Sequence, residues 1–95
     1  MEKRVVVVTG GATGIGLASS KKFAAKGDIV IIAGRREEKG RLAVQEIEAA
    51  GGEAIFVQTD VSKESDVKDL IDTAVERYGR IDVLFNNAGV PGKMA

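Results

Sequence analysis

The sequence contains no cysteine and no histidine, and its single proline is Pro91, close to the end of its 95 residues. The lack of cysteine excludes disulfides and thiolate chemistry, and the lack of histidine removes the most common general base and metal ligand. We therefore expect neither a metal site nor metal catalysis. No Pro-rich break, linker or low-complexity tract divides the chain, so its length predicts one domain with one core.

Net charge is absent too, because 14 Lys and Arg residues balance 14 Asp and Glu residues. Without an overall field, we do not expect binding to nucleic acid or to an anionic membrane surface, so a local site must hold any bound anion. The apolar run at residues 5–8 is far shorter than the roughly 20 residues of a membrane span. It is also too short for a signal peptide. These features predict a cytoplasmic protein with a small-molecule partner.

Short β-branched runs alternate with longer amphipathic stretches, which is typical of βαβ units. The pattern predicts strands at residues 4–9, 28–33, 53–58 and 82–86, and helices at 14–26, 37–50 and between 62 and 79. The run Val5-Val6-Val7-Val8 is continuously apolar, as expected for a central parallel strand covered on both faces. Right-handed crossovers then predict the strand order 3-2-1-4. We expect an α/β, Rossmann-like three-layer fold, which is a partial doubly wound sheet of four strands and three helices. Ligands should bind above the gap between strands 1 and 4, where the strand order changes direction.

Helical spacing predicts which side chains face the sheet. They are Ile15, Ala18 and Phe23 in the first helix, Ala43, Ile47 and Ala50 in the second, and Val67, Leu70, Ile71, Ala74, Val75 and Tyr78 in the third. Ser62 can cap the third helix, and Glu64 and Asp66 suit its positive first turn. Gly27 and Gly79 are placed to end helices in a left-handed conformation.

Residues 9–16, TGGATGIG, stand where the first strand passes into the first helix. Gly10 would permit a tight turn, Gly14 would let the backbone approach a pyrophosphate, and Gly16 would allow the helix to pack closely on the sheet. The helix N-terminus offers unpaired N–H groups to that anion, and Thr13 can add a hydroxyl. Such a loop can be only a turn, but a strand before it and a helix after it are the context of a dinucleotide site. No Gly-Lys-Ser/Thr follows, which excludes a P-loop.

The spacing Thr-Gly-x-x-x-Gly-x-Gly at residues 9–16 resembles the cofactor motif of the short-chain dehydrogenases/reductases. Asp60-Val61 resembles the family's adenine-contacting pair, and Asn86-Asn87-Ala88-Gly89 resembles its Asn-Asn-Ala-Gly motif, which supports the central sheet and borders the adenosine ribose. The three motifs occur in the family's order, and the resemblance covers essentially all 95 residues. The resemblance implies that residues 1–95 are a partial NAD(P)-binding Rossmann domain, the N-terminal cofactor-binding portion of a family oxidoreductase.

The residues by themselves also allow plainer interpretations. Asp60 can be a helix-entry residue close to Ser62. Asn86 and Asn87 can be a polar strand end. Both segments nevertheless fall at the carboxyl edge of the sheet, where open α/β folds bind ligands.

The second strand runs into Gly34-Arg35-Arg36, where a site that prefers NAD would place a carboxylate on the ribose 2′-hydroxyl. Gly34 leaves room for a 2′-phosphate, and Arg35 offers a forked, permanently charged donor. Arg36 can assist from the start of the helix. The sequence therefore favours NADP(H) over NAD(H), the alternative being that both arginines are solvated charges on an exposed loop.

The complete set of candidate cofactor-binding residues is Gly10, Thr13, Gly14, Ile15, Gly16, Arg35, Arg36, Asp60, Val61, Asn87, Ala88 and Gly89. We name no catalytic residue, because the resemblance implies a Ser and a Tyr-x-x-x-Lys motif beyond Asn-Asn-Ala-Gly. The one tyrosine, Tyr78, is followed four positions later by Asp82 and belongs to the core stripe of the third helix. We therefore expect this chain alone to be inactive.

Two functions remain open at this point. The first is the front portion of an NADP(H)-dependent oxidoreductase that reduces a carbonyl or oxidises an alcohol by hydride transfer. The second is a nucleotide-binding or purely structural Rossmann module without turnover. In either case the fourth strand is expected to be an open edge. We expect that edge to mediate self-association or contact with a C-terminal portion of the protein.

Overall fold

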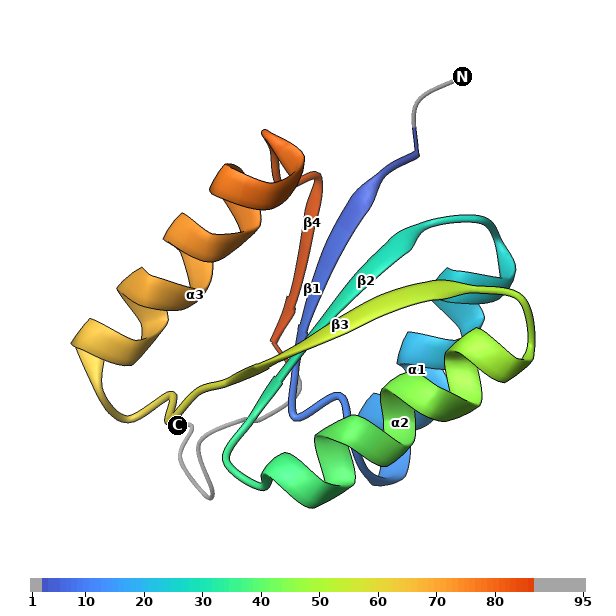
Figure 1. Ribbon diagram of the computed structural model, residues 1–95. Helices are drawn as coiled ribbons and strands as arrows, with labels where there is room; N and C mark the ends of the chain where they lie inside the picture. The colour runs from blue at the N-terminus through green and yellow to red at the C-terminus, as the bar shows by residue number, and fades with distance from the viewer. Residues whose placement is uncertain (1–2, 87–95) are drawn as a thin grey trace.

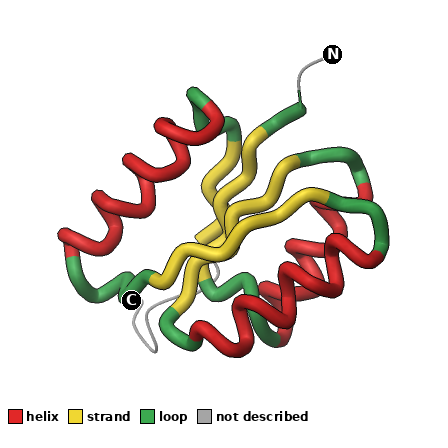
Figure 2. The backbone as a smooth tube through the Cα atoms, in the orientation of Figure 1, coloured by secondary structure: helices red, strands yellow, loops and turns green. Residues whose placement is uncertain are grey.

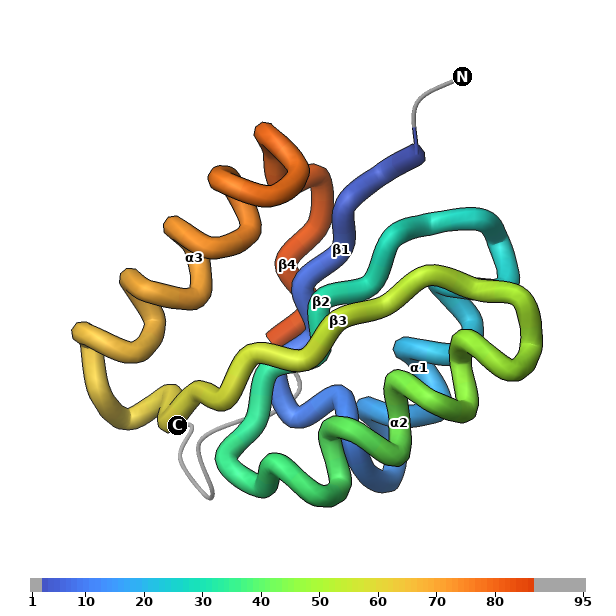
Figure 3. Tube along the Cα trace, viewed as in Figure 1, coloured from blue at the N-terminus to red at the C-terminus, as the bar shows by residue number. Residues whose placement is uncertain are grey.

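The computed structural model describes residues 3–86 and contains one parallel sheet with helices on both sides. Its elements, in chain order, are β1 (Val5–Thr9), α1 (Gly14–Ala25), β2 (Ile29–Gly34), α2 (Glu37–Ala49), β3 (Glu53–Gln58), α3 (Glu64–Tyr78) and β4 (Val83–Asn86). The strand order is β3-β2-β1-β4, as predicted from the sequence. Figure 3 shows the result of this order: β4, near the end of the colour scale, lies beside β1 at its beginning.

The sheet is the middle of three layers. Helices α1 and α2 cover one face and α3 covers the other (Figures 1 and 2). Because alternate side chains of a strand point to opposite faces, Val6 and Val8 pack on the α1 and α2 side, whereas Val5 and Val7 pack on the α3 side. All four valines are buried, which explains why β1 is apolar without alternation. The three-layer α/β prediction is confirmed.

Pairing in register aligns the ends of the strands. Val7 of β1 lies opposite Ile31 of β2 and Leu84 of β4, and all three pairings of the sheet are parallel. The carboxyl ends of β1, β2 and β3 therefore lie at one edge, and each is followed there by the loop that enters a helix (Figure 1). This edge carries the predicted site.

The prediction for the buried face of α1 is wrong in part. Ile15 is 75% exposed and Ala18 is also exposed. The buried residues are Gly16, Ser20 and Ala24, spaced four apart so that they share one face. Phe23 packs against the core, as predicted. The small residues let α1 lie close to the strands, which turns the larger Ile15 towards solvent.

Two further core predictions are wrong, in α2 and α3. In α2, Ala43 and Ile47 are buried as expected, but Ala50 lies one residue beyond the helix and is exposed. In α3, Leu70 and Ala74 are buried, whereas Val75 is 47% exposed. Val75 follows Ala74 by one residue, a rotation of about 100° around the helix axis, which carries it out of the contact face.

Ser62 does not cap α3 as the sequence suggested. The N-cap residue is Lys63, and its side chain makes no capping hydrogen bond. The Ser62 hydroxyl instead donates to Oδ1 of Asp60 at 2.6 Å. Asp66, in the first turn, accepts a 2.9 Å bond from the backbone N–H of Asp60 and so ties the loop to the helix. The glycine prediction for the other end holds, because Gly79 ends α3 with φ 80°.

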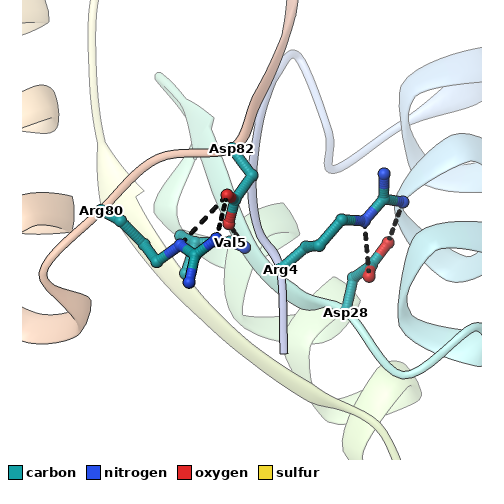
Figure 4. Close-up of polar contacts among 5 residues, drawn as sticks. All are labelled: Arg4, Val5, Asp28, Arg80 and Asp82. Carbon is teal, nitrogen blue, oxygen red and sulfur yellow. Dashed lines mark hydrogen bonds and ion pairs between the residues drawn. The ribbon is translucent and has the colours of Figure 1, made fainter. Parts of the chain in front are cut away.

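Charged side chains fasten the strands at the amino edge, opposite the predicted site (Figure 4). Arg4 binds Asp28 through two hydrogen bonds of 3.2 and 2.9 Å. The Asp82 carboxylate accepts a 2.7 Å bond from Val5 N–H, and the Asp82 backbone N–H donates to the Val5 carbonyl at 2.8 Å. Hydrogen bonding from Arg80, followed by that from Val5 N–H, holds the pKa of Asp82 below its ordinary value. These contacts join β4 to β1 and β1 to β2.

None of the helices between residues 3 and 86 has the length and apolar character required to cross a bilayer.

Candidate cofactor-binding site

The loop between β1 and α1 turns at two glycines in the left-handed region. Gly10 has φ 67° and Gly14 has φ 56°. A side chain in this region costs roughly 1–2 kcal/mol, so glycine is the favoured residue at both positions. The Gly10 N–H donates to the Ala33 carbonyl at 2.8 Å and so continues the pairing of β1 with β2 into the loop. The tight turn predicted at Gly10 is confirmed.

Gly11 lies at a close approach between the loop and α1, which was not predicted from the sequence. A Cβ atom there would lie 2.8 Å from Ser20 Oγ and 3.0 Å from the Val8 carbonyl oxygen. The buried Ser20 hydroxyl lies 3.2 Å from the Gly11 carbonyl oxygen and 2.9 Å from that of Gly16, within hydrogen-bond distance of both. The available sequence signal was Ser20, a small polar residue four positions after Gly16. The contact holds the loop against the first turns of α1.

The N-terminus of α1 carries backbone N–H groups that have no hydrogen-bond partner within the helix. Thr13 is the N-cap residue with φ −143° and ψ 158°, and its side chain makes no capping hydrogen bond. The first helical bond runs from Leu17 N–H to the Thr13 carbonyl at 3.1 Å. The N–H groups of Gly14, Ile15 and Gly16 precede that bond and therefore have no partner within the helix. This helix end is suited to an anion, because its N–H groups and its dipole both favour negative charge.

A pocket of about 300 Å³ brings the two predicted halves of the site together. Its lining residues are Gly10, Ala12, Thr13, Gly34, Arg35, Arg36 and Lys39. Gly34 leaves the space expected of it, because a Cβ there would come no closer than 4.0 Å to Phe56. Lys39 was not predicted, since one lysine on the first turn of a helix gives no signal that separates it from an ordinary surface charge.

The cations of this pocket are not held in close ion pairs, although the charge of Arg35 does act on the Asp60 carboxylate. Within residues 3–86, no ion pair involves Arg35, Arg36 or Lys39. The backbone that carries them is held in place, because Gln58 of β3 donates to the Arg35 carbonyl at 3.1 Å. The site therefore presents local positive charge on a protein with no net charge, as an anion site requires.

A larger cavity, of about 480 Å³, lies at the far ends of α1 and α2. Small and apolar residues dominate its lining, and its two charged residues, Lys21 and Glu46, form an ion pair with each other. That pairing leaves no excess charge to attract a phosphate. The smaller pocket is the better candidate for the dinucleotide despite its size.

Asp60 lies at the end of β3, close to the same edge of the sheet. Its Oδ1 accepts hydrogen bonds from the Ser62 hydroxyl at 2.6 Å and the Ser62 N–H at 3.0 Å. These two bonds, with smaller contributions from the charges of Arg35 and Lys63, hold the pKa of the Asp60 carboxyl below its ordinary value. Asp60 therefore lies in the loop that leads into α3 and binds Ser62, in line with the plainer interpretation. Its contact with adenine, and that of the 43% exposed Val61, stay predictions.

The end of β4 meets the end of β1 through side chains. The Thr9 hydroxyl donates to Asn86 Oδ1 at 2.7 Å, so Asn86 helps to join the two strands. The candidates Asn87, Ala88 and Gly89 lie outside the described residues. The pocket described above is lined by residues that follow β1 and β2.

Between residues 3 and 86, the structure contains no group of three or more Asp, Glu, His or Cys side chains that could hold a metal ion. Tyr78 packs against the core beneath α3, as predicted, so its hydroxyl-bearing ring belongs to the packing of that helix.

Comparison with protein families matches residues 4–95 to the family described as short chain dehydrogenase. The chain belongs to the short-chain dehydrogenase family. An uncharacterized oxidoreductase of Listeria innocua is 46% identical over 90 residues, which cover 95% of this chain and 36% of that protein. A short-chain dehydrogenase/reductase homolog of Bacillus subtilis, YusS, is 43% identical over 92% of this chain and 81% of its own length. The chain thus spans only about a third of the Listeria relative.

Solved structures of the short-chain dehydrogenase family have the same fold. An actinorhodin polyketide ketoreductase with NADPH is 40% identical, with a TM-score of 0.90 over 98% of this chain and 36% of that one. A metagenomic short-chain oxidoreductase in complex with NADP is 41% identical, with a TM-score of 0.88 over 92% of this chain and 39% of that one. The Rossmann architecture predicted from the sequence is confirmed.

Proposed function

We propose that residues 1–95 form a partial dinucleotide-binding domain, the NADP(H)-binding portion of a short-chain oxidoreductase that reduces a carbonyl or oxidises an alcohol. The observation that carries this proposal is the pocket in which the β1–α1 loop faces Arg35, Arg36 and Lys39. Bound NADP(H) would supply or accept the hydride. The residues of this chain bind and orient the adenosine end of the cofactor.

Each part of the dinucleotide is assigned to groups on the carboxyl edge of the sheet. The diphosphate accepts hydrogen bonds from the N–H groups at the start of α1 and from the Thr13 hydroxyl. The exposed Ile15 side chain covers it from the solvent side. The 2′-phosphate binds Arg35 and Arg36. The adenine contacts Asp60 and Val61, and the ribose contacts Asn87, Ala88 and Gly89.

The preference for NADP(H) over NAD(H) is supported by three features. Gly34 stands where a carboxylate would repel the 2′-phosphate, and the described residues that line the pocket include cations but no acidic side chain. Two structural neighbours of this chain are solved with NADPH or NADP.

Isothermal titration calorimetry on the folded chain tests the proposal directly. NADPH is expected to bind at least about tenfold more tightly than NADH, because a charge-assisted hydrogen bond contributes about 1.5–3 kcal/mol. Raising the salt concentration should weaken NADPH binding more than NADH binding, since only NADPH carries the additional phosphate. Absence of heat with both dinucleotides would reject the site, and equal affinities would reject the preference.

A second candidate function is a nucleotide-binding module without turnover. The Bacillus subtilis homolog supports this candidate because that relative is itself short: this chain covers 81% of its length. We also propose that the 95-residue chain alone has no dehydrogenase activity, since its sequence contains no Tyr-x-x-x-Lys motif. Steady-state oxidation of NADPH by the purified chain with a carbonyl substrate would disprove that part. A cytoplasmic location stays a prediction from the sequence.

We propose further that the free edge of β4 pairs with another strand, from a second copy or from a C-terminal portion of the protein. In the described part of the sheet β4 is a terminal strand, and its Leu84 side chain is 55% exposed. Unpaired backbone groups beside an exposed apolar side chain favour strand addition. We expect the chain to sediment as a dimer or larger species at micromolar concentration, and Leu84→Lys to shift it towards monomer. A monomeric wild-type chain in analytical ultracentrifugation would contradict this.

A further inference from the structure

We propose that Lys39 is a third ligand of the adenosine 2′-phosphate and strengthens the selection of NADP(H) over NAD(H). This inference rests on the proposed function, because it concerns the same pocket. It extends that function from the two arginines that follow β2 to a residue on the first turn of α2. Among the described residues, Arg35, Arg36 and Lys39 are the charged members of the pocket lining.

The position of Lys39 follows from the way α2 begins. Arg36 is the N-cap residue, and the first bond of the helix runs from Gly40 N–H to the Arg36 carbonyl at 3.0 Å. Residues three positions apart at a helix start lie on the same side, with about 5–6 Å between their Cβ atoms. Lys39 therefore stands above Arg36 and faces the same pocket.

Carboxylates in the same turn do not neutralise this lysine. Glu37 and Glu38 are the acidic residues of the first turn of α2. Glu37 accepts hydrogen bonds of 2.7 and 3.1 Å from Arg41, and these two side chains line a neighbouring pocket together. Lys39 has no ion-pair partner among residues 3–86. Its charge remains available to a ligand.

A close contact with β3 fixes the turn that carries Lys39. Gly40 is buried, and a Cβ atom on it would lie 2.1 Å from Cδ1 of the Phe56 ring. The helix backbone thus rests directly on the Phe56 ring, and the adjacent Lys39 backbone cannot move away from the pocket without lifting α2 from that ring. The Lys39 side chain is flexible, but the contact between Gly40 and Phe56 fixes the backbone that carries it.

Three cations close together repel one another unless an anion lies between them. A phosphate monoester is the ligand class that suits them, because it carries a charge of about −1.5 to −2 near pH 7 and three strong acceptor oxygens. NADP(H) whose diphosphate is bound by the β1–α1 loop would bring such a group, its adenosine 2′-phosphate, next to Gly34. Lys39 would meet that phosphate from the side opposite the loop.

The test compares two ligands that differ only in the 2′-phosphate, adenosine 2′,5′-bisphosphate and 5′-AMP, in NMR titrations of the full chain. Lys39→Met should weaken binding of the bisphosphate about three- to tenfold, as expected for one partly solvated charge contact. Binding of 5′-AMP should change less than about twofold, because 5′-AMP lacks the group that the lysine contacts. Lys39→Arg should retain most of the affinity, since it keeps the charge.

The matched control is Lys22→Met, which removes an exposed lysine from the last turn of α1 and should leave both affinities unchanged. If the wild-type chain prefers the bisphosphate but Lys39→Met keeps that preference in full, Lys39 is not a ligand and the proposed function survives. If the wild-type chain binds the two ligands equally or not at all, the proposed function fails and the inference fails with it. Equal losses for both ligands would overturn the assignment to the 2′-phosphate.

Discussion

Replacing Gly40 with valine should destabilise the protein by roughly 1–3 kcal/mol, the usual cost of overpacking a filled core. A Cβ atom at this position would lie 2.1, 2.3 and 2.5 Å from Cδ1, Cε1 and Cγ of Phe56. The ring is half-buried and packs against the core beneath α1 and α2, so displacing it would break those contacts. Either α2 must lift from β3 or the ring must leave its place. Urea denaturation followed by circular dichroism measures the loss.

Helix propensity works weakly against this effect, because valine is a somewhat better helix former than glycine. The contact is isolated by introducing Gly40→Val into a Phe56→Ala background, where the substitution should cost little or even stabilise the protein. Gln45→Val, at an exposed position of the same helix, is the matched control and should change stability by less than about 1 kcal/mol. A Gly40→Val loss of the same size with and without the Phe56 ring would show that the clash is not its cause.

Arg35→Ala is expected to weaken NADPH binding about tenfold or more and to leave NADH binding nearly unchanged. The reason is the loss of a charge-assisted contact, worth about 1.5–3 kcal/mol, that only the 2′-phosphate can make. The loop itself should survive, because Gln58 bonds the backbone carbonyl of Arg35 and not its side chain. Calorimetry with both dinucleotides measures the two affinities on one protein.

Arg41→Ala is the control for Arg35→Ala. Arg41 is an exposed arginine one turn into α2, and it already pairs with Glu37. Its removal should leave the ratio of the two affinities unaltered apart from a small effect of the released carboxylate. If Arg35→Ala lowers both affinities equally, the arginine supports the loop as a whole and does not recognise the 2′-phosphate.

The sheet was predictable from the sequence, whereas the helix faces were predictable only in part. The valine run of β1 and the apolar run of β2 are unambiguous, and the strand limits differ by no more than one residue from those expected. The face of α1 was misjudged because its contact residues are small: Ser20 and Ala24 carry less apolar signal than Ile15, which points to solvent. Apolar spacing shows which side chains favour burial, but not how closely a backbone can approach.

The same division holds for the site. Gly10 and Gly14 were predictable because a turn from strand to helix requires special backbone angles, which both adopt. Arg35 was predictable because it follows a strand end. Lys39 and the Gly11–Ser20 contact depend on how α2 and α1 sit on the sheet, which no local pattern records. Ser62 was wrongly predicted as a cap because its hydroxyl donates to the Asp60 carboxylate and is not available to the N-terminus of α3.

The charged contacts at the amino edge of the sheet lie far from the carboxyl edge, which carries the predicted site. Arg4, Asp28 and Asp82 act at one end of β1, and the glycine turn begins at the other, about 15 Å away at 3.3 Å per residue. Perturbations separated by more than about 7–10 Å combine additively as a rule. Substitutions after β2 that change the cofactor preference should therefore combine additively with substitutions at the amino edge that raise stability.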